Sequence, residues 1–104
     1  MIIEVRTYTI KPGLRDRFIA FFEKRAIPEQ QAVGIKVLGP LLDTENPNVF
    51  LFLRAFPSLE ERDRMKSLFY DGPVWKNELE GIAMPMIEHY SAVLTETTPG
   101  FVTL

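Results

Sequence analysis

The sequence has no cysteine and a single histidine, His89, among its 104 residues. Without cysteine the chain can form no disulfide framework, no thiolate nucleophile and no cysteine-based metal or cluster site. One imidazole cannot assemble a multi-histidine metal site within one chain, and the scattered glycines form neither a dinucleotide-binding nor a phosphate-binding loop. We therefore expect neither a bound metal nor a cofactor. Because the chain has no cysteine to form disulfides, the cytoplasm is the expected compartment.

The sequence also lacks an excess of positive charge and a long apolar run. Twelve Lys and Arg against fourteen Asp and Glu give a net charge of −2, so nucleic acid is not an expected partner. The longest uninterrupted apolar run, Val49 to Leu53, is far shorter than the ~20 residues of a membrane helix. The N-terminus has no basic region followed by an apolar stretch, so we expect neither membrane insertion nor secretion.

Apolar residues make up 46% of the chain and include eight Phe, which is enough for a substantial core. A chain of this length supports one such core, so we expect a single domain over residues 1–104 whose last part, about 97–104, is a tail.

The hydrophobic pattern predicts the order strand, helix, strand, strand, helix, strand. The segments are residues 1–10, 14–27, 35–42, 49–56, 58–70 and 86–95, with a short helix over 74–79. Pro28 is expected to end or kink the first helix, because proline lacks the N–H donor. Ser58 and Glu61 have the spacing of a capping box at the start of the second helix, and Gly81 is expected to end the short helix.

This order predicts an α+β, ferredoxin-like fold, a four-stranded antiparallel sheet with two helices on one face. The third strand is apolar on both faces, one aliphatic (Val49, Leu51, Leu53, Ala55) and one aromatic around a single charge (Phe50, Phe52, Phe56, Arg54). The helices cover one face only, and three exposed aromatics are unusual in a soluble monomer. We expect the aliphatic face beneath the helices and the aromatic face against a second copy, in a homodimer.

The first strand and its turn, Glu4 to Gly13, resemble the opening signature of the NIPSNAP family: Glu, apolar, Arg, Thr, Tyr, Thr, apolar, Lys, Pro, Gly. Further similarities are the apolar strand 49–54, Trp75, and the helix start that carries Phe56, Ser58, Leu59, Glu61 and Arg62. The resemblance spans nearly the whole chain up to the tail. It implies a dimeric α/β barrel and little about chemistry, because the family has no general reaction.

Three polar side chains, Glu4, Arg6 and Tyr8, share one face of the first strand, and Arg54 lies beside Phe52 on the third. We expect Glu4, Arg6 and Arg54 to form a buried ionic cluster that lines the space between the two sheets. One interpretation is a network that orients the dimer, since buried charges need partners. The other is ligand recognition, with Arg6 or Arg54 as the anchor for a carboxylate or enolate.

His89 has two interpretations: a general base or axial haem ligand, or a solvent-facing residue. The pattern does not decide which residues of the last strand point inward, because Glu88 and Tyr90 compete with His89 and Ser91.

Trp75, like Phe52, fits either the core and interface or an aromatic ligand wall. The charged residues of the second helix are interpreted as a solvated surface; they are Glu60, Glu61, Arg64 and Lys66.

The favoured hypothesis is a small NIPSNAP-like homodimer that binds a small amphipathic organic anion inside the barrel. A first alternative is a cofactor-independent monooxygenase or isomerase, by analogy with the dimeric α/β-barrel fold. A second is a protein-interaction module, which would have no deep cavity. The ligand-binding hypothesis uses Glu4, Arg6, Tyr8, Phe52, Arg54, Trp75 and His89, and whether the protein is an enzyme stays open.

Overall fold

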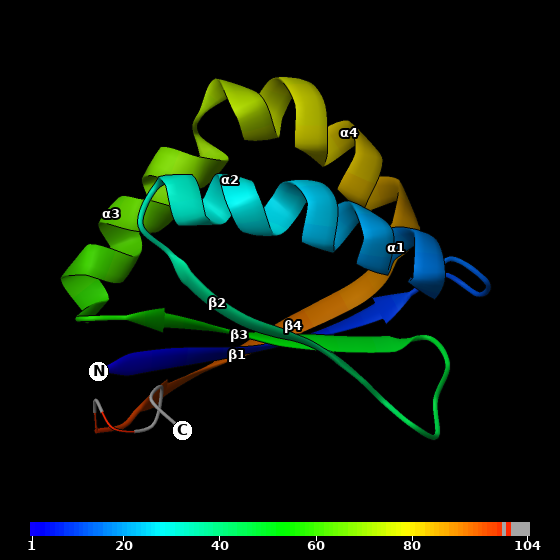
Figure 1. Ribbon diagram of the computed structural model, residues 1–104, viewed down its shortest axis with the longest axis horizontal. Coiled ribbons are helices and arrows are strands. Elements are labelled where there is room, and N and C mark those ends of the chain that lie inside the picture. The colour runs from blue at the N-terminus through cyan, green and yellow to red at the C-terminus, as the bar shows by residue number, and fades with distance from the viewer. Residues whose placement is uncertain (99, 101–104) are drawn as a thin grey trace.

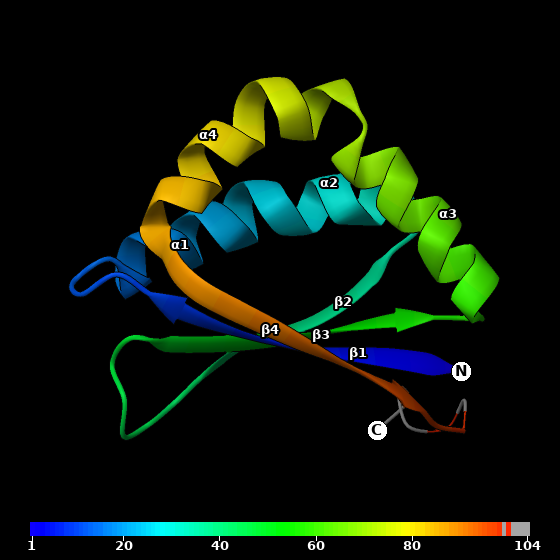
Figure 2. The same ribbon diagram turned by 180° about the vertical axis from the view of Figure 1, so that it is seen from behind.

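The computed structural model describes residues 1–98 and 100. Its four strands, β1 (Ile2–Ile10), β2 (Lys36–Leu42), β3 (Val49–Phe56) and β4 (Ile87–Glu96), form an antiparallel sheet in the order β2-β3-β1-β4. All helices lie on one side of this sheet in both views (Figures 1 and 2). The predicted ferredoxin-like arrangement is confirmed. Within the described residues, no helix has the length and apolar character needed to cross a membrane.

The first helix continues past Pro28, where the sequence predicted an end or a kink. Three segments follow one another without a break: α1 (Arg15–Phe21), η1 (Phe22–Ala26) and α2 (Ile27–Ala32). The η1 segment is a π-helical turn in which the Ile27 N–H donates to the Phe22 carbonyl, five residues back. This wider turn lies directly before Pro28, whose ring would crowd a regular α-helix. The helix ends instead near Gly34, whose φ of +96° favours glycine.

The second helical region begins as predicted with α3 (Leu59–Tyr70), whose Ser58 hydroxyl accepts the Glu61 N–H at 3.1 Å. The Glu61 carboxylate pairs with Arg64 and so does not complete the capping box.

After α3 come η2 (Trp75–Leu79), α4 (Glu80–Ala83) and the short 3-10 turn η3 (Met84–Met86). The prediction that Gly81 ends this region is wrong. Gly81 does not have the positive φ of a helix-ending glycine, and the backbone continues helically past it.

At the chain ends, Thr97 pairs with Met1 through backbone hydrogen bonds of 2.8 and 2.9 Å, next to the paired strands β1 and β4. Residues 99 and 101–104 of the predicted tail lie outside the described residues.

The two faces of β3 are the reverse of the prediction. Phe50, Phe52, Arg54 and Phe56 point toward the helices and are at most 2% exposed, whereas the alternating aliphatic side chains face the side that carries no helix. The reason is the composition of the first helix. Its aromatic side chains pack onto those of the sheet, with ring centroids 4.7 Å apart for Phe22 and Phe52.

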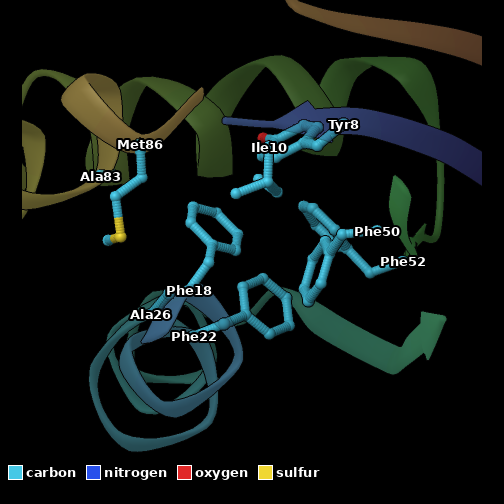
Figure 3. Close-up of a cluster of buried hydrophobic side chains, with 9 residues drawn as sticks. All are labelled: Tyr8, Ile10, Phe18, Phe22, Ala26, Phe50, Phe52, Ala83 and Met86. Carbon is cyan, nitrogen blue, oxygen red and sulfur yellow. The ribbon is translucent and has the colours of Figure 1, made fainter. Parts of the chain in front are cut away.

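We call the resulting group the aromatic cluster (Figure 3). Its members are Tyr8, Phe18, Phe22, Phe50 and Phe52.

The register between β1 and β4 decides the orientation of the last strand. Tyr8 lies opposite Tyr90, with ring centroids 5.7 Å apart, so Tyr90 is on the helix side of the sheet. His89 lies opposite Thr9 and therefore belongs to the other face.

Candidate functional site

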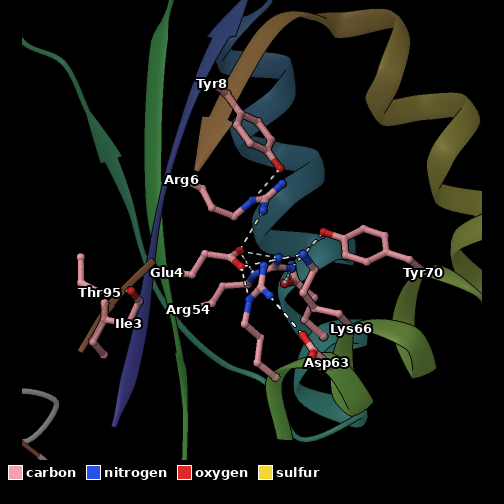
Figure 4. A network of polar contacts seen from close by, with 11 residues as sticks. Ile3, Glu4, Arg6, Tyr8, Arg54, Asp63, Lys66, Tyr70 and Thr95 are labelled. Carbon is pink, nitrogen blue, oxygen red and sulfur yellow. Dashed lines mark hydrogen bonds and ion pairs between the residues drawn. The ribbon is translucent and has the colours of Figure 1, made fainter. Parts of the chain in front are cut away.

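A buried carboxylate, Glu4 of β1, is the centre of a polar network between the sheet and the helices (Figure 4). Its Oε1 accepts from Arg6 Nη1 at 2.8 Å and from Arg54 Nε and Nη2 at 2.9 and 2.6 Å. Its Oε2 accepts from Arg62 Nε at 2.8 Å. Arg54 reaches Glu4 because the two residues are directly paired across β1 and β3. The predicted ionic cluster is confirmed, but it lies beneath the helices of its own chain, so its predicted place between two sheets is wrong.

Helix α3 supplies two further cations to this network. Arg62, Lys66 and Tyr70 are spaced four residues apart and so share one helix face. Lys66 Nζ lies 3.9 Å from Glu4 Oε2, and the Tyr70 hydroxyl accepts from Arg54 Nη1 at 2.9 Å. The side chains of Arg62 and Lys66 are only 17% and 27% exposed. The interpretation of Lys66 as part of a solvated surface is therefore wrong.

We call Glu4, Arg6, Arg54, Arg62 and Lys66 the ionic cluster. Burial by itself would raise the pKa of Glu4, but the charge of Arg54 and the hydrogen bonds from Arg6, Arg54 and Arg62 outweigh burial and lower that pKa to about 2. Glu4 is thus a carboxylate at every ordinary pH. With both oxygens occupied by guanidinium donors, it is poorly suited to accept a proton.

The ionic cluster contains four cationic side chains and one carboxylate. Among the described residues, one other acidic group touches it, Asp63, which pairs with Arg62 at 3.2 Å and whose side chain is 74% exposed. Desolvation, together with repulsion from Arg62, Arg54 and Arg6, lowers the pKa of Lys66 against the opposing attraction of Glu4. The surroundings of Lys66 therefore carry an excess of positive charge.

A partly enclosed cavity of about 510 Å³ adjoins the ionic cluster, a size in the range of small-molecule sites. Cations line it through Arg6 of β1 and through Arg62 and Lys66 of α3, while Glu80 is the acidic residue on its wall. The rest of the lining is mainly aromatic and includes Tyr8, Phe18, Phe21, Phe22, Phe52, Phe69, Tyr70, Trp75 and Tyr90.

Four of the predicted ligand-binding residues line this cavity: Arg6, Tyr8, Phe52 and Trp75. Burial raises the pKa of the Tyr8 hydroxyl, which accepts from Arg6 Nε at 3.2 Å. Trp75 packs edge-on against Tyr70, with ring centroids 5.1 Å apart.

The structure does not bring Glu4, Arg54 or His89 to the cavity surface. Arg54 is fully buried and directs its donors to Glu4, Gln30 and Tyr70, so it holds the network together and cannot anchor a ligand. His89 is exposed on the opposite side of the sheet.

Three further residues that line the cavity, Arg62, Lys66 and Tyr90, were not predicted as site residues. The sequence did contain a signal for Arg62 and Lys66 of α3. A buried Glu4 beside two arginines needs a covering element, and Arg62 and Lys66 are spaced so that they share one face of a helix.

The NIPSNAP family model matches residues 3–99. A NIPSNAP domain protein from Burkholderia xenovorans has a similar structure, with 19% identity, a TM-score of 0.85, and coverage of 95% of this chain and 96% of that one. A NIPSNAP family protein from Agrobacterium tumefaciens is 25% identical, with a TM-score of 0.82 and coverage of 95% and 92%. An antibiotic biosynthesis monooxygenase shares the fold at 16% identity, with a TM-score of 0.69 and coverage of 95% and 100%. No match was found among curated proteins.

Proposed function

Because the chain belongs to the NIPSNAP family, whose fold it shares, we propose that it binds a small amphipathic anion in the cavity between its helices and its sheet. The observation that carries this proposal is the surplus of cations at one end of the cavity. Arg6, Arg62 and Lys66 line that end, and their shared buried counter-charge is the one carboxylate of Glu4. An anionic group placed there would reduce an unfavourable concentration of positive charge.

The walls of the cavity suit an apolar ligand body. Phe52, Trp75 and Tyr90 present aromatic surface to it, and aromatic walls favour flat, apolar groups. A pocket that is mostly apolar with a few placed charges is typical of a specific small-molecule site.

The cavity also distinguishes this function from the alternatives. A pure protein-interaction module is expected to have no deep cavity, and a volume of about 510 Å³ disfavours it. An enzyme that works by proton transfer would need an acceptor other than Glu4, because a pKa of about 2 makes this carboxylate a very weak base.

The test compares naphthoate with naphthamide, an uncharged molecule of nearly the same shape. We expect naphthoate alone to bind and to raise the melting temperature, since a ligand bound by the native state stabilises it. The variants Arg6→Met and Lys66→Met should weaken naphthoate binding in a folded protein, whereas Arg17→Met, on an exposed part of α1, should not. Equal binding of the acid and the amide, or unchanged affinity in both cavity variants, would refute the proposal.

We also propose that two copies pair through the sheet face opposite the helices, which corrects the predicted Phe50, Phe52 and Arg54 interface. Exposed aliphatic side chains lie on both edge strands of this face: Val93 of β4 is 59% exposed and Leu41 of β2 52%. An exposed apolar sheet face needs a cover, and a second copy offers the same surface in return.

If the two copies pair in this way, sedimentation of the wild type should show a dimer at micromolar concentration. The variant Val93→Glu should shift the equilibrium toward the monomer, because the new carboxylate would have to be desolvated in the interface. The matched control is Tyr90→Glu, three residues earlier in β4 on the helix side. A monomeric wild type excludes the pairing.

A further inference from the structure

We propose that the anionic group recognised in this cavity is doubly charged and tetrahedral, a phosphate monoester carried on an apolar body. This inference rests on the proposed function and specifies its ligand class. It starts from the number and arrangement of cations that the ionic cluster leaves available at the cavity wall.

Three cationic groups there retain donors. Arg6 directs Nε to Tyr8 and Nη1 to Glu4, and Arg62 directs Nε to Glu4 and Nη1 to Asp63. Among the described residues, the Nη2 atoms of both arginines have no hydrogen-bond partner. Lys66 Nζ has Glu4 Oε2, 3.9 Å away, as its acidic neighbour, a separation too long for a hydrogen bond.

These donors come from two elements that face each other across the cavity end. Arg6 projects from β1, while Arg62 and Lys66 lie one turn apart on α3. A single carboxylate offers two oxygens in one plane and is well matched by one forked guanidinium. A phosphate monoester offers three terminal oxygens in a tetrahedral arrangement, one for each of the three cationic groups.

The charge balance points in the same direction. Four cations share Glu4 and the largely exposed Asp63, so two positive charges remain without an acidic partner in the cluster. Glu80 also lines the cavity, but among the described residues it makes no ion pair with these cations. A monoanion would leave one of the two positive charges unneutralised. A phosphate monoester carries about −1.5 to −2 at pH 7 and neutralises both.

The lowered pKa of Lys66 is consistent with this count, because the positive surroundings disfavour its protonated form when no anion is bound. The charged and titratable groups around this end are Glu4, Arg6 and Tyr8 from β1, Arg54 from β3, and Arg62, Asp63 and Tyr70 from α3. Glu80 from α4 is a further acidic group on the cavity wall. Any experiment that varies pH must separate their titration from that of the ligand.

The test uses naphthyl phosphate and naphthyl sulfate, which share shape and apolar body but differ in charge. Sulfate esters are monoanions throughout, whereas the phosphate gains its second charge with a pKa of about 6. At about pH 7.5 and fixed ionic strength, we expect calorimetry to show the phosphate binding about tenfold more tightly than the sulfate, an effect typical of one added ionic contact. At about pH 5 the difference should largely disappear, while the sulfate reports any titration of the protein itself.

Lys66→Met supplies the second arm, because Lys66 makes no close ion pair whose loss would threaten folding. This variant should remove most of the preference for phosphate over sulfate, and Lys76→Met, an exposed lysine outside the cavity, should keep it.

The outcomes separate the two proposals. If naphthoate, sulfate and phosphate bind equally, or if Lys66→Met keeps the phosphate preference, the phosphate inference is wrong while anion binding stands. If none of the three binds, both proposals are wrong.

Discussion

The aromatic cluster and the ionic cluster both lie in the layer between the helices and the sheet. They differ in whether their side chains find all their partners within the protein. The aromatic cluster is packed around Phe50, which is fully buried, with ring centroids 5.0 Å from Phe18 and 4.9 Å from Phe22, although its other members also line the cavity. The ionic cluster has four cations for one buried carboxylate and opens onto a cavity. The first arrangement needs no ligand to be complete, whereas the second is more positive than folding requires.

The largest effect is expected from removing the one buried negative charge. Glu4→Gln leaves Arg6, Arg54 and Arg62 without their common counter-charge, so the free energy of unfolding should fall by about 3 to 5 kcal/mol in urea denaturation. Glu61→Gln is the matched control: it breaks only the exposed pair with Arg64 and should cost less than about 1 kcal/mol. Equal losses in both variants would mean that the ionic cluster is not a buried network.

Acid should reproduce part of this loss. The folded pKa of Glu4 is lowered from 4.5 to about 2, so its contribution to stability is complete above about pH 4.5 and disappears as the pH falls toward 2. This shift corresponds to about 3 kcal/mol. Urea denaturation between these pH values should show the decline in the wild type and a flatter profile in Glu4→Gln. Parallel profiles would contradict the lowered pKa.

A change at Phe50, the member of the aromatic cluster that does not line the cavity, should affect stability without affecting binding. Phe50→Leu leaves a small void among the rings, which should lower the free energy of unfolding by about 1 to 2 kcal/mol. Phe50 does not line the cavity, so the affinity for naphthoate should stay within twofold of the wild type, roughly the error of calorimetry. A large loss of affinity would show that the two regions are not separable.

Much of the fold could be predicted from the sequence because strand alternation and helical spacing are local properties. The faces of β3 could not be assigned, because the strand is apolar on both, with Phe50 on one face and Leu51 on the other. Which face the helices cover depends on the partners that Phe22 and Arg62 find across the fold, and this is information that no single segment contains.

The candidate site divides in the same way. Arg6 and Tyr8 could be found from their shared strand face, whereas Lys66 was misinterpreted because a charged helix residue normally faces water. Lysine and arginine stems pack along apolar surface, so residue type alone does not place their charged ends. Passage of the helix through Pro28 was missed because it depends on the π-helical turn η1, which has no strong sequence signature.

We propose above all that the excess of cations in the ionic cluster slightly lowers the stability of the ligand-free protein and serves to bind the anionic ligand. Lys66→Met tests it most directly, because its folded pKa is lowered and the charged amine is therefore unfavourable in the ligand-free protein. Without ligand, the variant should be as stable as the wild type or more stable, by up to about 1 kcal/mol in urea. With millimolar naphthyl phosphate the wild type should become the more stable of the two. The same order of stability with and without the ester would contradict the account.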